Sequence, residues 1–158
     1  MTSDKVLWSR NAIPAPSKRP GRNSWVPLVT TPVAAGVVIK QDNKYLLVQE
    51  SMASQYGLWN WPAGKVDVGE TIEEAAVREA KEESGYNVRL IRKLGIWQDS
   101  AKHASQHAFE AEIIGGELNF PKNELLDAKW LTKEEIYSMK DKLRTSWIIG
   151  AIEILEKA

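Results

Sequence analysis

A chain of 158 residues, 43% of them hydrophobic, is long enough to bury a core as one domain. The absence of cysteine excludes disulfides, thiolate metal sites and a cysteine nucleophile, and the balance of 21 basic and 21 acidic residues argues against a general polyanion binder such as a nucleic-acid protein. No apolar run is long enough for a membrane span or a secretory signal, so we expect a cytoplasmic protein that does not enter membranes.

Residues 1–32 are predicted to form an extended, basic N-terminal arm that precedes a domain at 33–158. Five of the seven prolines fall in the arm, where each removes a backbone donor and disfavours helix. The arm holds five basic residues against one acidic residue, a net charge of +4. These cations are too sparse to indicate nucleic-acid binding. A linker, or a segment exchanged between the subunits of a homodimer, is the preferred interpretation.

The predicted strands begin directly after the arm. An apolar run at Val33–Ile39 and a second at Tyr45–Val48 are separated by the turn residues Gln41, Asp42 and Asn43, which predicts a hairpin. Further strands are predicted at 88–96, at 107–114, where Gly115 and Gly116 close the strand, and around 128–131.

Three helices are predicted from cap chemistry and periodicity. Thr71 and Glu74 form a capping-box pattern, and Gly85 suits the left-handed position that ends a helix, so a helix is expected between them. The capping pattern recurs at Thr132–Glu135, and Trp147–Glu156 reads as an apolar terminal helix. Strands covered by helices on both faces predict a layered α/β or α+β sandwich.

Three carboxylates are expected on one side of the first helix. At 100° per residue, Glu83 lies roughly 40° and Glu82 roughly 300° around the helix from Glu79. The same arithmetic places Ile72, Ala75 and Ala76 on that side, whereas Glu73, Glu74 and Lys81 point away. The three acids are therefore predicted to continue the stripe that faces the interior.

Such an arrangement needs a counter-charge. The acids repel one another near the negative end of the helix dipole, and Arg78, four residues from both Glu74 and Glu82, cannot neutralise all three. An all-oxygen ligand set favours Mg²⁺ or Mn²⁺. Because a glycine-containing loop precedes the helix, the combination predicts hydrolysis of a phosphoanhydride by metal-positioned water. The alternative is a solvated, charged helix face with no ligand.

The segment from Gly64 to Tyr86 resembles the Nudix box of the Nudix hydrolases. Gly64 is followed after five residues by Glu70 and after seven more by the run Arg78–Tyr86, and every fixed position matches. Only Ala80 and Tyr86 stand where larger aliphatic residues are commoner. Beyond the box, the resemblance covers about residues 33–140. It implies a mixed β-sheet between helices, with a loop-helix-loop that binds divalent metal ions.

Site roles follow from the resemblance by position. Glu79, Glu82 and Glu83 are implied to be the metal-binding acids, one of them able to orient or deprotonate water, with the Gly64 carbonyl as an additional ligand. Arg78 is implied to hold the glutamates, and Glu70 to brace the loop against the helix. A further acid from outside the box is expected; we prefer Glu124, and the other candidates are Glu112, Glu117 and Asp127.

Several further residues are candidates for substrate binding. Trp59 or Trp61 could stack on a base, although packing in the core or at its rim is the commoner role of tryptophan. His103 and His107 lie in or after a loop that often touches substrate in the family, against the alternative that they are ordinary structural residues. Lys65 could meet a phosphate group, or it could be an ordinary exposed lysine.

The predicted function is Mg²⁺-dependent hydrolysis of a nucleoside diphosphate linked to another group. A nucleoside triphosphate, including an oxidised one, is the preferred substrate and would yield a nucleoside monophosphate and pyrophosphate. Features that ADP-ribose, dinucleoside polyphosphate and coenzyme A members tend to carry are missing from the sequence. The alternatives are hydrolysis of other diphosphates, such as dinucleoside polyphosphates or nucleotide sugars, and a nucleotide-sensing or partner-binding module with little catalysis.

Overall fold

The computed structural model describes residues 32–99 and 104–157, so the predicted arm at 1–32 lies outside the described residues except for Pro32. The strands are β1 (Val33–Gln41), β2 (Lys44–Glu50), β3 (Trp59–Asn60), β4 (Ala63–Lys65), β5 (Tyr86–Asp99), β6 (Ala104–Gly116) and β7 (Leu125–Thr132). The helices are α2 (Ile72–Ser84), α3 (Lys133–Ser138) and α4 (Trp147–Lys157), with short 3-10 turns η1 (Ala53–Gln55) and η2 (Lys140–Lys142). None of these helices is long and apolar enough to cross a membrane.

The strands form one mixed sheet. Its main path runs β3-β2-β1-β6-β5, with β4 also paired to β1 and β7 paired to β2. The neighbours β1 and β6 are parallel, and the other pairs are antiparallel. β1 therefore lies at the centre of the sheet and contacts strands from both halves of the chain.

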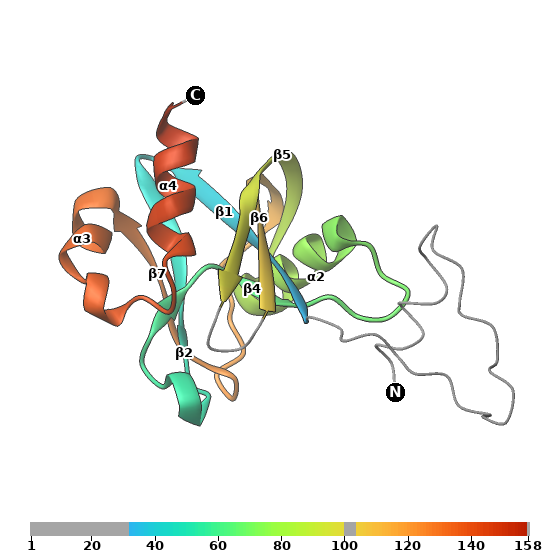
Figure 1. Ribbon diagram of the computed structural model, residues 1–158, viewed down its shortest axis with the longest axis horizontal. Coiled ribbons are helices and arrows are strands. Elements are labelled where there is room, and N and C mark those ends of the chain that lie inside the picture. The colour runs from blue at the N-terminus through green and yellow to red at the C-terminus, as the bar shows by residue number, and fades with distance from the viewer. Residues whose placement is uncertain (1–31, 100–103, 158) are drawn as a thin grey trace, which may run out of the picture.

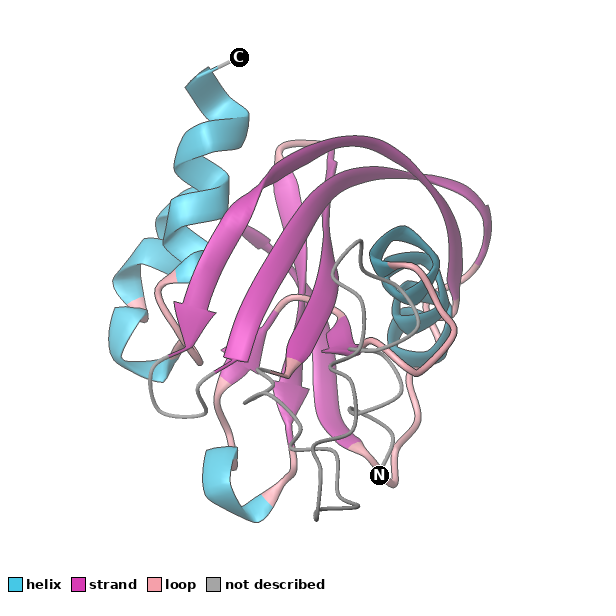
Figure 2. Ribbon diagram, turned by 45° about the vertical axis from the view of Figure 1, so that its right-hand side comes forward, coloured by secondary structure: helices cyan, strands magenta, loops and turns pink. Residues whose placement is uncertain are grey.

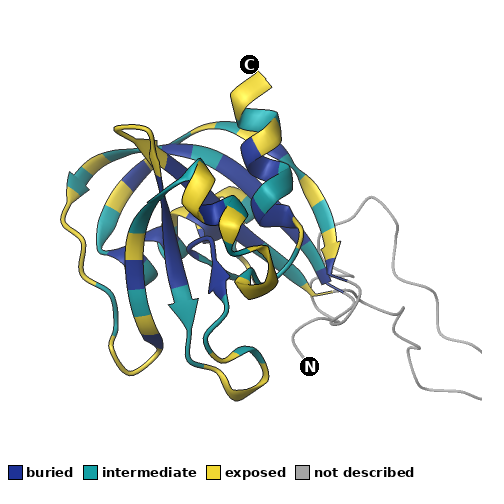
Figure 3. Ribbon diagram, turned by 90° about the vertical axis from the view of Figure 1, so that its left-hand side faces the viewer, coloured by how far each residue is buried: buried dark blue, intermediate teal, exposed yellow. Residues whose placement is uncertain are grey.

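Helices cover the sheet on two sides, as Figures 1 and 2 show for α2 on one side and for α3 and α4 on the other. Alternate residues of β1 point to opposite faces of the sheet, and each face carries its own hydrophobic core. Ala35, Val37 and Ile39 pack with the alanines of α2, whereas Val38 packs with α4. Burial follows the same layers, since the centre of the sheet is buried and its outer rim is exposed (Figure 3). The predicted sandwich with a mixed sheet between helices is confirmed.

All five predicted strands are present, and each is longer than predicted. The hairpin turns at Asp42 and Asn43, whose φ angles of 50° and 63° are left-handed, as two-residue hairpin turns require. β5 and β6 extend to 14 and 13 residues because they pair with each other along almost their whole length. The short strands β3 and β4 were not predicted, since two or three residues are too few to show a period.

Both predicted helix caps are present. The Thr71 side chain accepts a hydrogen bond from the Glu74 backbone N–H, and the Glu74 side chain accepts one from the Thr71 backbone N–H. Gly85 ends α2 at a φ of 84°. Thr132 and Glu135 repeat the reciprocal pair at α3. The caps fix where α2 starts and stops, and hence which of its side chains face the sheet.

Candidate active site

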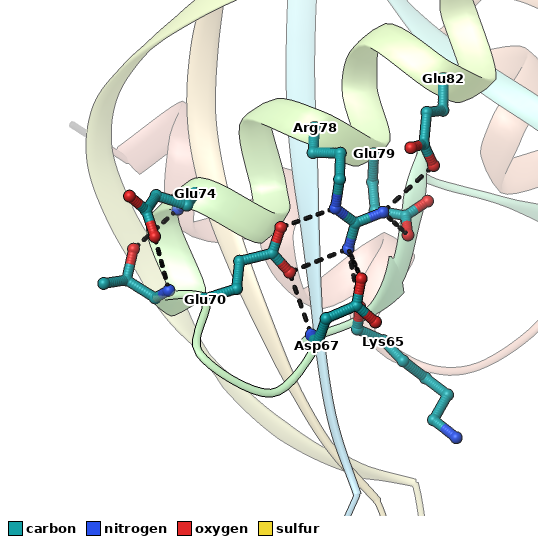
Figure 4. A network of polar contacts seen from close by, with 8 residues as sticks. Lys65, Asp67, Glu70, Glu74, Arg78, Glu79 and Glu82 are labelled. Atoms are coloured by element: carbon teal, nitrogen blue, oxygen red, sulfur yellow. Dashed lines mark hydrogen bonds and ion pairs between the residues drawn. The ribbon is translucent and has the colours of Figure 1, made fainter. Parts of the chain in front are cut away.

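Arg78 is the centre of a polar network that ties α2 to the loop before it. Its Nε donates to Glu70 at 2.6 Å, and its Nη1 donates to Glu79 at 2.8 Å and to Glu82 at 3.1 Å. Nη2 reaches the carbonyl oxygen of Lys65 at 3.0 Å, so the guanidinium touches both the loop and the helix (Figure 4). Because a planar guanidinium offers five donors in a fixed fork, one side chain can hold several oxygens in place.

The predicted orientation of the three acids is correct for two of them and wrong for Glu82. The Glu79 side chain is only 12% exposed, whereas that of Glu82 is 56% exposed, at the edge of the helix face. There Glu82 pairs with Arg78 in solvent. Of the two acids four residues from Arg78, Glu82 is the one that pairs with it, because Glu74 is engaged in the helix cap at Thr71.

Glu79 and Glu83 lie against strand β4. The backbone N–H of Ala63 donates to Glu83 Oε1 at 3.0 Å. The neighbouring Gly64 has no side chain, and any Cβ there would overlap the Glu79 carboxylate. The box glycine therefore allows a carboxylate to approach the backbone of β4 directly.

Burial dominates the protonation equilibria of both carboxyl groups. It raises the pKa of Glu83 well above its usual value; the hydrogen bond from Ala63 lowers that pKa, and the charges of Glu79, Glu50 and Glu124 raise it. The pKa of Glu79 is raised by burial against the lowering effect of Arg78. Two largely buried carboxyl groups beside further acids form a site in which a cation would be strongly favoured.

A cavity of about 510 Å³ opens beside these glutamates. Its acidic end is lined by Glu50, Glu79, Glu83 and Gly64. The other polar lining residues come from five further elements or connections and are Gln55, Asn60, Asp99, Gln106 and Arg144. The volume is that of an ordinary small-molecule site, and apolar residues such as Val33, Met52 and Trp147 complete its lining.

The acidic end fits a hard divalent cation by its chemistry. Its ligands are carboxylate oxygens and a backbone carbonyl, which suit Mg²⁺ or Mn²⁺. Within residues 32–99 and 104–157, no three acidic or histidine side chains converge tightly enough to form a ready metal cage. The carboxylates line one cavity, but they do not converge on a single position. The site therefore fits a divalent cation by the type of its ligand atoms and not by their arrangement.

Comparison with known proteins decides the family. The sequence profile of the NUDIX domain matches residues 30–149. The chain belongs to the Nudix hydrolase family. It is therefore an enzyme, and its box is the segment Gly64–Tyr86.

Three relatives illustrate the membership of this Nudix hydrolase. It is 38% identical over 140 residues to a putative 8-oxo-dGTP diphosphatase of Bacillus subtilis, covering 77% of this chain and 92% of the relative. It is 40% identical over 116 residues, 71% of this chain, to putative nudix hydrolase 1 of Caenorhabditis elegans, but it spans only 32% of that protein's length. A NUDIX hydrolase structure from Nitrosomonas europaea aligns with a TM-score of 0.71 and 27% identity over 81% of this chain and 90% of that one.

The other predicted substrate residues of this Nudix hydrolase lie in different environments. Lys65 is exposed and lines the cavity. Trp59 and Trp61 lie in the core at 7% and 0% exposure and do not line the cavity, so core packing describes both. His107 is buried in β6, its Nδ1 2.7 Å from Lys93 Nζ, and its pKa is lowered by burial and by Lys93. His103 lies outside the described residues.

The four candidate acids outside the Nudix box are dispersed. Glu124 is exposed, and its backbone carbonyl accepts a hydrogen bond from Ser51, directly after β2. Glu112 of β6 pairs with Arg89 of the edge strand β5, and Asp127 pairs with Lys129. Glu117 lines a separate, shallow pocket at the end of α2. Among them, Glu124 lies close enough for its charge to raise the pKa of Glu83.

Sequence reasoning missed most of the cavity wall of this Nudix hydrolase. Glu50 carried a signal, because it continues the alternation of Leu46 and Val48 beyond an apolar run. Gln106 carried a weaker one as a polar residue within a buried strand. Arg144 carried none: it lies in an irregular segment, where it pairs with Asp99 at 3.4 Å and donates to Gln55 at 2.5 Å.

Proposed function

We propose that this Nudix hydrolase uses Mg²⁺ or Mn²⁺ to hydrolyse a nucleoside triphosphate, including base-oxidised forms, to a nucleoside monophosphate and pyrophosphate. The observation that carries the proposal is a cavity lined by Glu50, Glu79 and Glu83 and also by uncharged side chains such as Gln55, Gln106 and Trp147. The acidic residues suit a cation-bound phosphate chain, and the uncharged lining suits a nucleoside. The name of the Bacillus subtilis relative, a putative 8-oxo-dGTP diphosphatase, supports the same substrate class.

The residues divide the work of hydrolysis. Glu79, Glu83 and the Gly64 carbonyl would hold the cation, with Glu82 able to join them by rotating from the surface. A bound divalent cation supplies positive charge to the phosphate oxygens and activates water as the nucleophile. Water oxygen would bond to the α-phosphorus as the bond from that phosphorus to the bridging oxygen breaks and pyrophosphate leaves, and the proton of the water would pass to one of the box glutamates. Lys65, on the cavity wall, would donate to a phosphate oxygen, and Arg78 holds Glu79 throughout.

A nucleotide panel with product identification tests the proposal. Triphosphates with normal and oxidised bases, ADP-ribose, a nucleotide sugar and a dinucleoside tetraphosphate are incubated with Mg²⁺, and pyrophosphate and monophosphate are measured. We expect turnover of triphosphates to exceed that of the others, and to be lost in Glu82→Gln and Glu83→Gln but kept in Glu73→Gln, a charge-matched control on the exposed side of α2. Tight nucleotide binding without turnover would instead indicate a sensing module.

The proposal extends to assembly and location. We place the reaction in the cytoplasm, on small nucleotides and not on nucleic acid, and we assign the arm at 1–32 to a contact between two copies of the chain. The test compares the full chain with a chain that starts at Pro32, by light scattering. A dimer that becomes a monomer on removal of the arm supports the assignment, and an unchanged mass excludes it.

A further inference from the structure

The carboxylate of Glu50 at the acidic end of the cavity lies outside the Nudix box. Glu50 ends β2, where the pairing of β2 with β7 shifts register. It lines the same cavity as Glu79 and Glu83 of α2. The end of β2 therefore brings a third acid to the cavity that both helix glutamates line.

Asn60 fixes the orientation of Glu50. Asn60 is 4% exposed, and its Oδ1 accepts from the Trp147 indole at 2.8 Å and from the Trp61 backbone at 2.9 Å. Two donors on the oxygen determine which way the amide faces, so its NH₂ group must point the other way. There Nδ2 donates to Glu50 Oε2 at 3.2 Å.

The charge of Glu50 has no basic partner in the described part of the chain. Arg78 pairs with Glu79 and Glu82, and no salt bridge there involves Glu50 or Glu83. A neutral amide donor holds Glu50, and a neutral backbone donor holds Glu83. Two uncompensated carboxylates on one cavity wall would repel a phosphate chain unless a cation lay between them and it.

We propose that Glu50, oriented by Asn60, is a third carboxylate ligand at the metal-binding end of the cavity, and that Asn60 is its positioning residue. The inference rests on the proposed metal dependence and adds a ligand that the box does not contain. Glu50 coordinates the cation through a carboxylate oxygen, while the Asn60 amide keeps hold of Oε2. Hydrogen bonds thus connect Trp147, in the apolar core, to Asn60, and Asn60 to Glu50.

Manganese binding without substrate tests the inference on the whole chain. Free Mn²⁺ is titrated by electron paramagnetic resonance against the unmodified protein, Glu50→Gln and the control Glu73→Gln. We expect Glu50→Gln to weaken Mn²⁺ binding at least about tenfold, and Glu73→Gln to leave it within about twofold. Wild-type affinity in Glu50→Gln, or no Mn²⁺ binding by the unmodified protein, would overturn the proposal.

A second set of variants tests the role of Asn60. Asn60→Ala should weaken Mn²⁺ binding in the unmodified chain but add nothing in the Glu50→Gln background, since it acts through Glu50. Equal losses in both backgrounds would overturn the positioning role. If Asn60→Ala fails to fold, Trp147→Phe replaces it, because it removes the indole donor to Asn60 and keeps an aromatic ring in the core.

The outcomes also separate this inference from the proposed function. Triphosphate hydrolysis together with unchanged Mn²⁺ affinity in Glu50→Gln overturns the Glu50 assignment alone. Mn²⁺ binding that depends on Glu50 in a chain that hydrolyses no triphosphate overturns the proposed substrate and leaves the ligand in place.

Discussion

The carboxylate of Glu79 lies directly over the α-carbon of Gly64, with no room for a methyl group between them. Gly64 has no left-handed φ, so its backbone would accept alanine and only the contact with Glu79 forbids it. In Gly64→Ala, Glu79 must move away from the cavity. We expect kcat to fall roughly 100-fold while the fold is retained, as displacement of a catalytic group by about 1 Å can cost. Steady-state kinetics and circular dichroism check this.

Gly115→Ala is the matched control for that substitution. Its Cβ would meet only the Asn87 side chain, at 3.5 Å, an ordinary contact. Equal losses of kcat in the two variants would contradict the role given to Gly64.

Arg78→Lys should destabilise the protein by about 1–3 kcal/mol, because a lysine cannot reach Glu70, Glu79 and Glu82 at the same time. The free energy of unfolding in urea measures the loss. Arg89→Lys, which changes an exposed pair with Glu112 in the same way, should cost less than about 0.5 kcal/mol. A loss at Arg78 no larger than that at Arg89 would show that the network adds no stability.

Lowering the pH should reduce the free energy of unfolding, because it protonates Glu156. Hydrogen bonds from Tyr45, Lys40 and Lys133 lower the pKa of Glu156 to about 2, from the usual 4.5. A lowered pKa contributes stability that is complete above pH 4.5 and is lost as the pH falls toward 2. Glu156→Gln should therefore be less stable at neutral pH and show a flatter acid limb, measured by urea unfolding at several pH values. Glu153→Gln, on the exposed side of α4, should keep the steep limb.

Gly36→Ala should destabilise the centre of the sheet by about 1–3 kcal/mol. A Cβ at Gly36 would stand 2.7 Å from the Cβ of Ala63 and 2.9 Å from the Trp147 ring, so the contact between β1 and α4 would have to open. Thermal unfolding measures the effect. A midpoint equal to that of the unmodified chain would mean that this contact is looser than the distances imply.

The elements that sequence predicted well are those whose signals are local. The α2 caps depend on Thr71, Glu74 and Gly85, all within one short segment, and each takes the expected role. The sandwich followed from apolar periods that match the two cores. The positions of most Nudix-box residues could likewise be predicted, because they lie in a single helix and the loop before it.

The remainder of the site depends on long-range contacts that no local pattern encodes. Glu82 was expected to face inward, but its partner Arg78 holds it at the surface, and a helical wheel does not include such pairing. Arg144 reaches the cavity only because the segment before α4 pairs with β3, through the bridge between Trp59 and Leu143. Asn60 gains its role from a tryptophan 87 positions away.

The contribution of Arg144 and Trp147 to the cavity has a consequence for biosynthesis. Both residues line the pocket, yet they are translated well after the box and every strand of the sheet. A nascent chain can pair its strands and cap α2 while the pocket still lacks one wall. The polypeptide must emerge from the ribosome beyond Trp147 before this wall can form, so the pocket is completed only after every strand of the sheet has been synthesised.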